Sequence, residues 1–349
     1  MSNRVFMKCV KGTDRKPNQD TGAFRHSQEG EDGKMVTNLI RDDDADVVIP
    51  PAQFKQDEYG QISEDQQFVP TTTIVAVFDG HGTDGHHIAK IVRDYMDFAP
   101  NSISFNSPKQ DIREFIAHIQ DIIPKELRNE GIYYSSGGAC GTILFILQNE
   151  KGVKRFFLAQ LGDTQGFCIR GFGTKDVTVT QILPTHDVTN KDEAERIIKA
   201  SKTPGSGVAK DVSFTWSHRK GHIYNVNSDG TVVMDAKNEE KETASAHDGS
   251  KAGYLGIGGT RDISITTSFG NMEKKYLGMG YEGDIIEIDH KDGDVYLLTS
   301  DGITDTLELG MLNTFCSTTN VPKVLVEMLF ERAISTEFGD DMTAVAIIP

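Results

Sequence analysis

The sequence has few cysteines, and they are not paired. Cys9, Cys140, Cys168 and Cys316 lie far apart along the chain and form no C-x-x-C motif. This spacing argues against a cysteine zinc site, a redox motif and a disulfide framework. We therefore expect four reduced, structural thiols.

Long apolar runs are also missing. No stretch approaches the roughly 18 apolar residues that a membrane span requires, so we expect no membrane span. Residues 1–12 lack the apolar segment and small-residue cleavage site of a secretory signal. These absences favour a cytoplasmic or nuclear protein.

Positive charge is scarce, because 36 Lys and Arg face 52 Asp and Glu, giving a net charge of −16. Such a surface repels nucleic acid and anionic membranes, and we expect neither as a partner. It would also repel phosphate groups. Bound divalent cations would remove that difficulty, because they are often the largest local charges in a site.

Strand-like apolar runs punctuate the 349 residues. Their composition predicts strands over 73–78, 142–147, 155–161, 166–170, 177–182, 285–288, 295–299 and 343–348. Apolar stripes predict helices near 88–96, 112–127 and 324–329. Strands in runs with helices between them favour layered α+β packing over a βαβ repeat.

Two polar stretches interrupt this pattern. Residues from about 27 to 69 are acidic, and residues from about 190 to 259 are polar and glycine-rich and contain the single tryptophan, Trp216. Neither has the periodicity of a separate folded domain. We interpret the first as an insertion and the second as a surface flap.

Short acidic motifs occur where a predicted strand ends or a turn begins. They are Asn18-Gln-Asp20, Val77-Phe-Asp-Gly-His-Gly82, Thr299-Ser-Asp-Gly302 and Gly339-Asp-Asp-Met-Thr343. An Asp-Gly pair after an apolar strand projects a carboxylate from a rigid edge and lets the backbone approach a ligand. Carboxylates that converge from distant strands would suit Mg²⁺ or Mn²⁺, which prefer oxygen ligands.

Any one of these pairs alone is more often a simple turn, and we interpret Asp284 and Asp294 in that way. The order of the motifs is more specific, since it resembles the type 2C, or metal-dependent, serine/threonine protein phosphatases over nearly the whole chain. Further matching motifs are Gly12-Thr-Asp-Arg-Lys-Pro-Asn-Gln-Asp20, Ser136-Gly-Gly-Ala-Cys-Gly-Thr142, Leu161-Gly-Asp-Thr164, Pro184-Thr-His-Asp187, Glu195-Arg-Ile197, Ser268-Phe-Gly-Asn271, Leu298-Thr-Ser-Asp-Gly-Ile-Thr-Asp305 and Asp340-Asp-Met-Thr343.

The resemblance implies two Mg²⁺ or Mn²⁺ ions. Asp79 would bridge them, the carbonyl of Gly80 would bind one of them, and Asp301 and Asp340 would complete the other. Asp20 would orient water molecules on the metals.

The resemblance also implies a weaker third metal site, formed by Asp163 and Asp305 together with Asp301. Arg15 would bind the substrate phosphate, and His81 would protonate the departing serine or threonine oxygen. His81 suits that role because it lies two residues from Asp79 and because the ordinary pKa of histidine is near neutral.

The sequence departs from the usual family pattern at three positions. Gln19 stands where a glutamate is frequent, Asn271 where an aspartate usually follows glycine, and Gln165 where an arginine is common. We expect the missing carboxylate at Gln19 to weaken the binding of the second ion modestly. We expect the changes at Asn271 and Gln165 to affect flap geometry and substrate preference, not the metal centre.

For the fold, the resemblance implies an α-β-β-α sandwich: two antiparallel sheets, a helix pair on each outer face, and the binuclear metal cleft at one end. Residues 1–349 would form one catalytic domain that includes the insertion and the flap.

The implied function is hydrolysis of phosphoserine and phosphothreonine in signalling phosphoproteins by a hydroxide that bridges the metals. Two alternatives stay open. One is a catalytically inactive, phosphatase-like binding module, and the other is a metal phosphohydrolase that acts on small phosphate esters.

Overall fold

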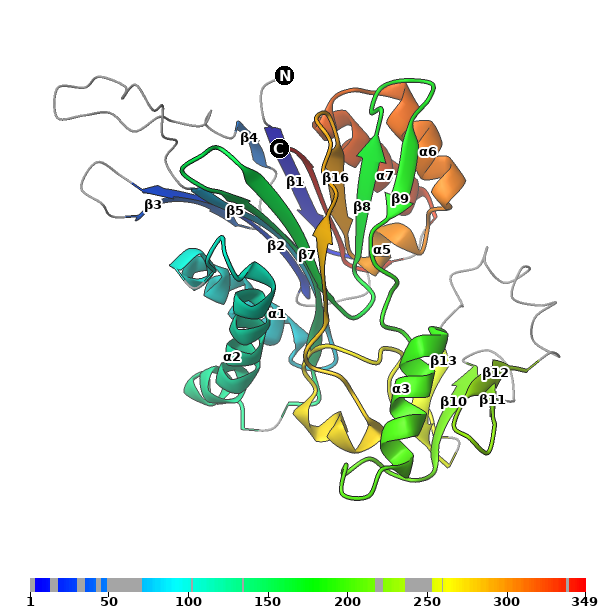
Figure 1. Ribbon diagram of the computed structural model, residues 1–349. Helices are drawn as coiled ribbons and strands as arrows, with labels where there is room; N and C mark the ends of the chain where they lie inside the picture. The colour runs from blue at the N-terminus through cyan, green and yellow to red at the C-terminus, as the bar shows by residue number, and fades with distance from the viewer. Residues whose placement is uncertain are drawn as a thin grey trace, which may run out of the picture.

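Two antiparallel β-sheets are stacked face to face (Figure 1). The computed structural model describes residues 4–12, 18–29, 35–41, 45–48, 71–101, 103–133, 135–216, 222–235, 253–258, 260–336 and 339–349. Of the predicted site residues, only Arg15 lies outside these ranges.

The first sheet has six strands in the order β4-β1-β17-β16-β8-β9. Their bounds are β1 Arg4–Val10, β4 Ala45–Val48, β8 Gln165–Arg170, β9 Thr178–Gln181, β16 Val295–Thr299 and β17 Met342–Ile348. The second sheet has the order β15-β7-β6-β5-β2-β3, and β14 pairs with β6. Its strands are β2 Asp20–Glu29, β3 Met35–Arg41, β5 Thr71–His81, β6 Gly138–Gln148, β7 Lys154–Leu161, β14 Phe269–Gly270 and β15 Asp284–Ile288.

Alternating side chains of both sheets form the core between them. Val75 and Val77 of β5 pack there with Leu144 of β6 and with Val345 and Ile347 of β17. The neighbouring residues on β5 and β6 point to the other face and contact helices. Because β6 is covered on both faces, all of its residues are buried, which explains its nearly continuous apolar sequence.

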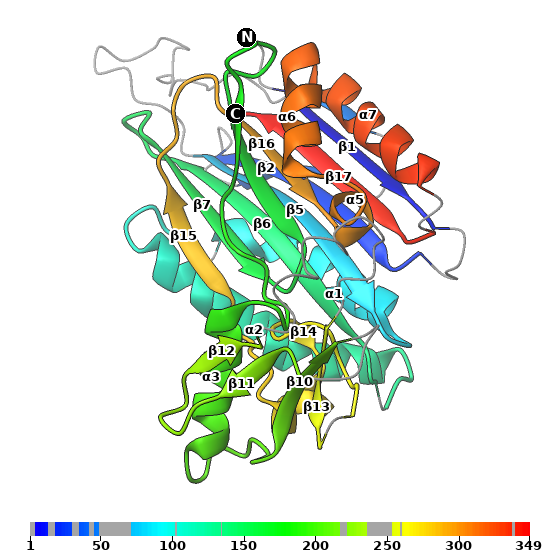
Figure 2. The same cartoon turned by 90° about the vertical axis from the view of Figure 1, so that its right-hand side faces the viewer.

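A pair of helices covers each outer face (Figures 1 and 2). The helices α1 (Gly85–Tyr95) and α2 (Pro108–Asn129) pack on the second sheet through apolar stripes. The helices α6 (Leu309–Thr318) and α7 (Pro322–Ser335) pack on the first. Short helical segments are η1 (Met96–Asn101), η2 (Met272–Leu277) and α5 (Asp301–Thr304). This arrangement confirms the α+β sandwich expected from the sequence.

The acidic stretch of about 27–69 contributes to both sheets where it is described. Its strand β3 pairs with β2 at the edge of the second sheet, and β4 pairs with β1 at the edge of the first. Residues 51–70 lie outside the described part of the chain.

The flap of about 190–259 has a small core of its own, which the sequence did not indicate. Helix α3 (Lys191–Lys202) packs with strands β10 (Val212–Trp216), β11 (Tyr224–Val226), β12 (Val232–Met234) and β13 (Gly253–Ile257). Trp216 is 3% exposed and belongs to this core. Figure 2 shows the flap below the ends of the central strands.

None of the helices in the described ranges has both the length and the apolar character to cross a bilayer.

We predict that Ile347→Ala destabilises the protein by about 2–5 kcal/mol, because it opens a cavity between the sheets where the side chain is fully buried. Ile334→Ala provides the control, since Ile334 is 59% exposed on α7. Its expected effect is within about 0.5 kcal/mol. Urea unfolding measures both, and equal losses would contradict the assigned core.

Candidate metal centre

The acidic motifs meet at one end of the sandwich. Asp79 lies near the end of β5, and Asp20 begins β2 directly opposite it in the ladder. Asp301 follows β16 at the start of α5, and Asp340 precedes β17. Asp163 lies in the turn that carries the chain from β7 in the second sheet to β8 in the first. Both sheets therefore supply carboxylates to one place.

Asp79, Asp163 and Asp301 form the centre of this group. One carboxylate oxygen from each lies within 4.8 Å of those from the other two. Asp20 is 5% exposed, and neither of its carboxylate oxygens has a hydrogen-bond partner of good geometry in the described part of the chain. Buried carboxylate oxygens without donors are suited to a cation.

Burial and mutual repulsion shift the pKa values of these groups. Burial raises the pKa of Asp79 well above its usual range, and the charges of Asp20 and Asp301 raise it further. Asp20 is shifted in the same direction, first by burial and then by neighbouring carboxylates. The pKa of Asp163 rises to about 7, mainly through burial and then through Asp301. A divalent cation would relieve this repulsion.

Gly80 allows the backbone to pass close to its neighbours beside Asp79. A Cβ atom at this position would lie 2.5 Å from the carbonyl carbon and oxygen of Gly85. Its amide also donates to the carbonyl oxygen of Gln19 at 3.0 Å, which ties β5 to the segment before β2. Only glycine fits this contact.

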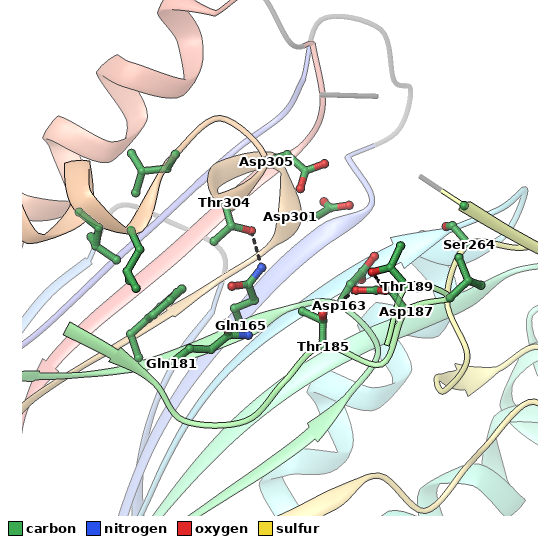
Figure 3. A pocket seen from close by; sticks show the side chains of 16 residues that line it. Asp163, Gln165, Gln181, Thr185, Asp187, Thr189, Ser264, Asp301, Thr304 and Asp305 are labelled. Atoms are coloured by element: carbon green, nitrogen blue, oxygen red, sulfur yellow. Dashed lines mark hydrogen bonds between the residues drawn. The ribbon is translucent and has the colours of Figure 1, made fainter. Parts of the chain in front are cut away.

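A pocket of about 430 Å³ opens beside the carboxylates (Figure 3). Asp163, Asp301 and Asp305 line it, and Asp305 is one helical turn after Asp301. Gln165 donates to the Thr304 hydroxyl at 3.2 Å in the same wall. The residues expected at the third metal site, Asp163, Asp301 and Asp305, therefore all line one pocket.

Asp341 fixes Gly12 and Gln19, which lie on either side of residues 13–17, and the motif order did not reveal this role. Its two carboxylate oxygens accept hydrogen bonds from the backbone amides of Gly12 and Gln19, each at 2.7 Å. The Gln19 side chain donates to the Gly82 carbonyl at 2.7 Å. These bonds hold both flanks of residues 13–17 against the metal centre.

His81 ends β5, and its Nε2 lies 2.6 Å from Oδ1 of Asn271. The Nδ1 atom of His87, in helix α1, lies 2.5 Å from a carboxylate oxygen of Glu130. His81 is thus the histidine on strand β5, two residues beyond Asp79.

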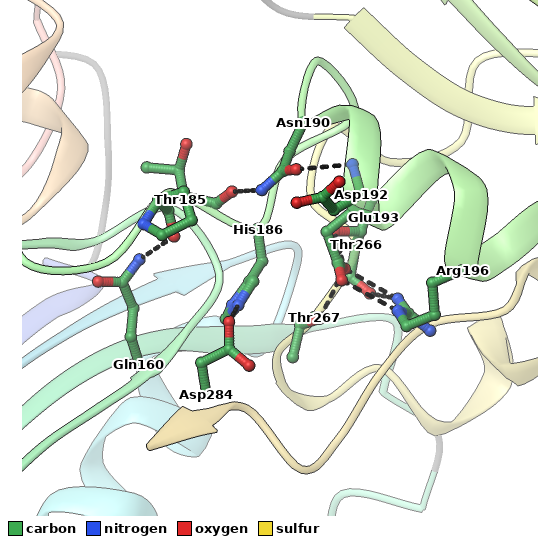
Figure 4. A network of polar contacts seen from close by, with 11 residues as sticks. Gln160, Thr185, His186, Asn190, Asp192, Glu193, Arg196, Thr266, Thr267 and Asp284 are labelled. Atoms are coloured by element: carbon green, nitrogen blue, oxygen red, sulfur yellow. Dashed lines mark hydrogen bonds and ion pairs between the residues drawn. The ribbon is translucent and has the colours of Figure 1, made fainter. Parts of the chain in front are cut away.

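A polar network joins the flap to the second sheet (Figure 4). Glu193 of α3 accepts hydrogen bonds from Arg196 and from the hydroxyls of Thr266 and Thr267. Burial alone would raise the pKa of Glu193, but the hydrogen bonds and charge of Arg196 outweigh it and lower the pKa to about 2.

The same network contains His186, which is 3% exposed. Its Nε2 lies 3.0 Å from a carboxylate oxygen of Asp284. Asp284 therefore anchors a buried histidine from the start of β15, so the interpretation of this residue as a simple hairpin turn was incomplete.

The residues present fit divalent cations. Carboxylates from two sheets converge, the two buried oxygens of Asp20 have no donor among the described residues, and the ligand set consists of oxygen atoms. A sandwich of this topology with an acidic centre at one end defines a metal-dependent phosphatase-like fold.

Comparison with known proteins agrees with this class. Residues 57–207 match the model of the protein phosphatase 2C family. No curated protein sequence matches the chain. The match and the fold together confirm the resemblance of the chain to the type 2C, PPM-type phosphatases.

Solved structures of similar fold span nearly the whole chain. One is a C. elegans sex determining protein, with a TM-score of 0.57 and 16% identity over 99% of this chain and 65% of that one. Another is PppA, a regulatory component of the T6SS in Pseudomonas aeruginosa, with a TM-score of 0.51 and 14% identity over 99% of this chain and 97% of that one.

A third is the Mycobacterium tuberculosis serine/threonine phosphatase PstP/Ppp. Its TM-score is 0.51 and its identity 14%, over 99% of this chain and 98% of that one. This chain thus spans about two thirds of the first of these proteins and almost all of the other two.

We predict that Asp163→Asn stabilises the metal-free protein increasingly as pH rises from about 4 to 7. The pKa of Asp163 is 3.8 when unperturbed and about 7 in the fold, so the folded state binds more protons in this window. The wild type therefore loses stability as pH rises, by at most about 1.4 kcal/mol per pH unit. Urea unfolding with chelator measures the difference, and a pH-independent difference would refute the shift.

We also predict that Asp341→Ala is less stable than Asp341→Asn by about 1–3 kcal/mol. Both variants remove the charge, but asparagine keeps an acceptor for the amide of Gly12 or Gln19. Urea unfolding compares them, and equal stabilities would show that these hydrogen bonds contribute little.

Proposed function

We propose that the chain is an active metal-dependent phosphatase that hydrolyses phosphoserine and phosphothreonine in proteins. The observation that carries this proposal is the group of Asp20, Asp79, Asp163 and Asp301 at one end of a phosphatase-type sandwich. The match to the protein phosphatase 2C family supports it.

Asp79, the carbonyl of Gly80, Asp301 and Asp340 would hold two Mg²⁺ or Mn²⁺ ions, and Asp163 and Asp305 would hold a weaker third ion with Asp301. When bound, such ions supply an activated water and offset the charge of the phosphoryl group. Asp20 would orient water from its position opposite Asp79.

The remaining chemistry belongs to side chains. Hydrolysis forms a bond between a water oxygen and phosphorus and breaks the bond to the serine or threonine oxygen. That oxygen leaves as a strong base unless it is protonated, and His81 would supply the proton. Arg15 would bind phosphoryl oxygens through its planar guanidinium group.

The inactive binding module is the first alternative. Such a module has no need for a group of buried, mutually repelling carboxylates, whose charged forms are costly without cations. Here the predicted ligands Asp20, Asp79, Asp301 and Asp340 are all present at the same end of the sandwich. Their retention favours the active enzyme.

We predict that the protein releases phosphate from a phosphothreonine peptide with Mn²⁺ or Mg²⁺ and that chelator abolishes this release. Asp79→Asn should lower turnover at least about 100-fold, because it removes the central carboxylate of the site. A phosphate-release assay measures the rates. Asp176→Asn, on an exposed loop, should retain wild-type turnover.

Two outcomes would redirect the assignment. A wild-type chain without turnover in either metal would support the binding module. Faster hydrolysis of a small phosphodiester than of the phosphopeptide would support the small-ester hydrolase.

A further inference from the structure

Three strands bring His81 next to Asn271. In the second sheet, His81 of β5 pairs with Gly138 of β6, and Gly138 pairs on its other side with Gly270 of β14. Asn271 directly follows Gly270. The His81 side chain therefore reaches across Gly138 to Asn271, with Nε2 of the imidazole 2.6 Å from the amide oxygen Oδ1.

The orientation of the Asn271 amide is determined by its other contacts. Its Nδ2 donates to the carbonyl oxygen of Ser136 at 3.2 Å, and its Oδ1 accepts from the hydroxyl of Ser268 at 2.8 Å. The oxygen must then face His81. Because this oxygen can only accept, Nε2 of His81 must carry the hydrogen.

The backbone of Asn271 is held just as firmly. Its φ of 46° is the only positive φ of a non-glycine residue in the described ranges, and the side chain is 1% exposed. Gln120 of α2 supports the turn, because it donates to the carbonyl of Ser268 at 2.9 Å and accepts from the amide of Gly270 at 3.1 Å. Unusual backbone conformations that are held in this way cluster at functional sites.

Gly138 keeps the path between the two side chains open. A Cβ atom at position 138 would lie 2.1 Å from Oδ1 of Asn271 and 2.6 Å from Nε2 of His81. Any larger residue would occupy the space of their hydrogen bond. This hydrogen bond thus explains why the motif Ser136-Gly-Gly-Ala-Cys-Gly-Thr142 has glycine at position 138.

We propose that Asn271 is a positioning residue for His81: its side-chain oxygen accepts a hydrogen bond from Nε2 and fixes the orientation and tautomer of the imidazole beside the metal centre. The catalytic consequence rests on the proposed function, in which His81 protonates the leaving oxygen. With Nε2 occupied in this bond, a proton that His81 passes to that oxygen comes from Nδ1.

The first test compares two substrates in Mn²⁺ with Asn271→Gly and Asn271→Asp. Glycine tolerates the positive φ but lacks the amide, whereas aspartate keeps an acceptor. We expect Asn271→Gly to lower kcat for a phosphothreonine peptide about 10–100-fold. The loss for p-nitrophenyl phosphate should be much smaller, because nitrophenolate leaves without a proton.

Asn271→Asp should restore most of the turnover of the phosphopeptide. Equal losses of Asn271→Gly on both substrates, or no loss on the phosphopeptide, would overturn the positioning role. A purely structural role would lower both rates together.

The second test does not depend on turnover. Nitrogen-15 NMR of the histidine side chains should show a protonated, hydrogen-bonded Nε2 for His81 in the wild type and in Asn271→Asp, and loss of this signal in Asn271→Gly. A wild-type imidazole protonated on Nδ1 alone would overturn the assigned hydrogen bond.

The two tests separate this inference from the proposed function. A wild type that turns over neither substrate would overturn the proposed function and the catalytic part of the inference. The NMR signal would still decide whether Asn271 fixes the tautomer of His81.

Discussion

Repulsion among closely spaced carboxylates is the constraint on which the rest of this structure depends. One carboxylate oxygen from each of Asp79, Asp163 and Asp301 lies within 4.8 Å of the other two, and burial raises the pKa values of Asp79 and Asp163. Such a group is stable when the surrounding chain holds it rigidly and a bound proton or a cation offsets its charge. The sandwich supplies the rigidity, because its carboxylates project from strand ends that are locked by a core between two sheets.

The backbone around the centre is fastened at several points that are distant in sequence. Asp341 binds the amides of Gly12 and Gln19, and Gly80 binds the carbonyl of Gln19. These contacts join the residues that follow β1 and precede β2 to the residue that precedes β17. They lie at the end of the sandwich where the aspartates meet. Hydrogen bonds to charged acceptors are stronger than those between neutral groups. Asp341 therefore fixes the backbone at Gly12 and Gln19 in addition to adding negative charge.

The sequence predicted strands from short apolar runs and helices from apolar stripes, and it missed β1 to β4, α6 and the elements of the flap. All eight expected strands occur, from β5 to β17, and the three expected helices are α1, α2 and α7. The helix, strands and core of the flap were not predicted. Its strands have only three to five residues, and its core forms only when β10, β13 and α3 come together. Motif order predicted the aspartates, whereas Asp341 acts through backbone contacts that span 322 residues or more and leave no local pattern.

The three departures from the family pattern share one physical property: each places a neutral amide beside a strongly acidic centre. Gln19 donates to the Gly82 carbonyl, Gln165 donates to the Thr304 hydroxyl, and Asn271 donates to the Ser136 carbonyl. A carboxylate, which is the usual family residue at positions 19 and 271, could make neither the Gln19 nor the Asn271 bond, because it has no hydrogen to donate when ionised. It would also add negative charge where repulsion is already greatest. Asn271 therefore gives His81 a fixed acceptor and leaves the charge of the site unchanged, which a carboxylate at this position could not do.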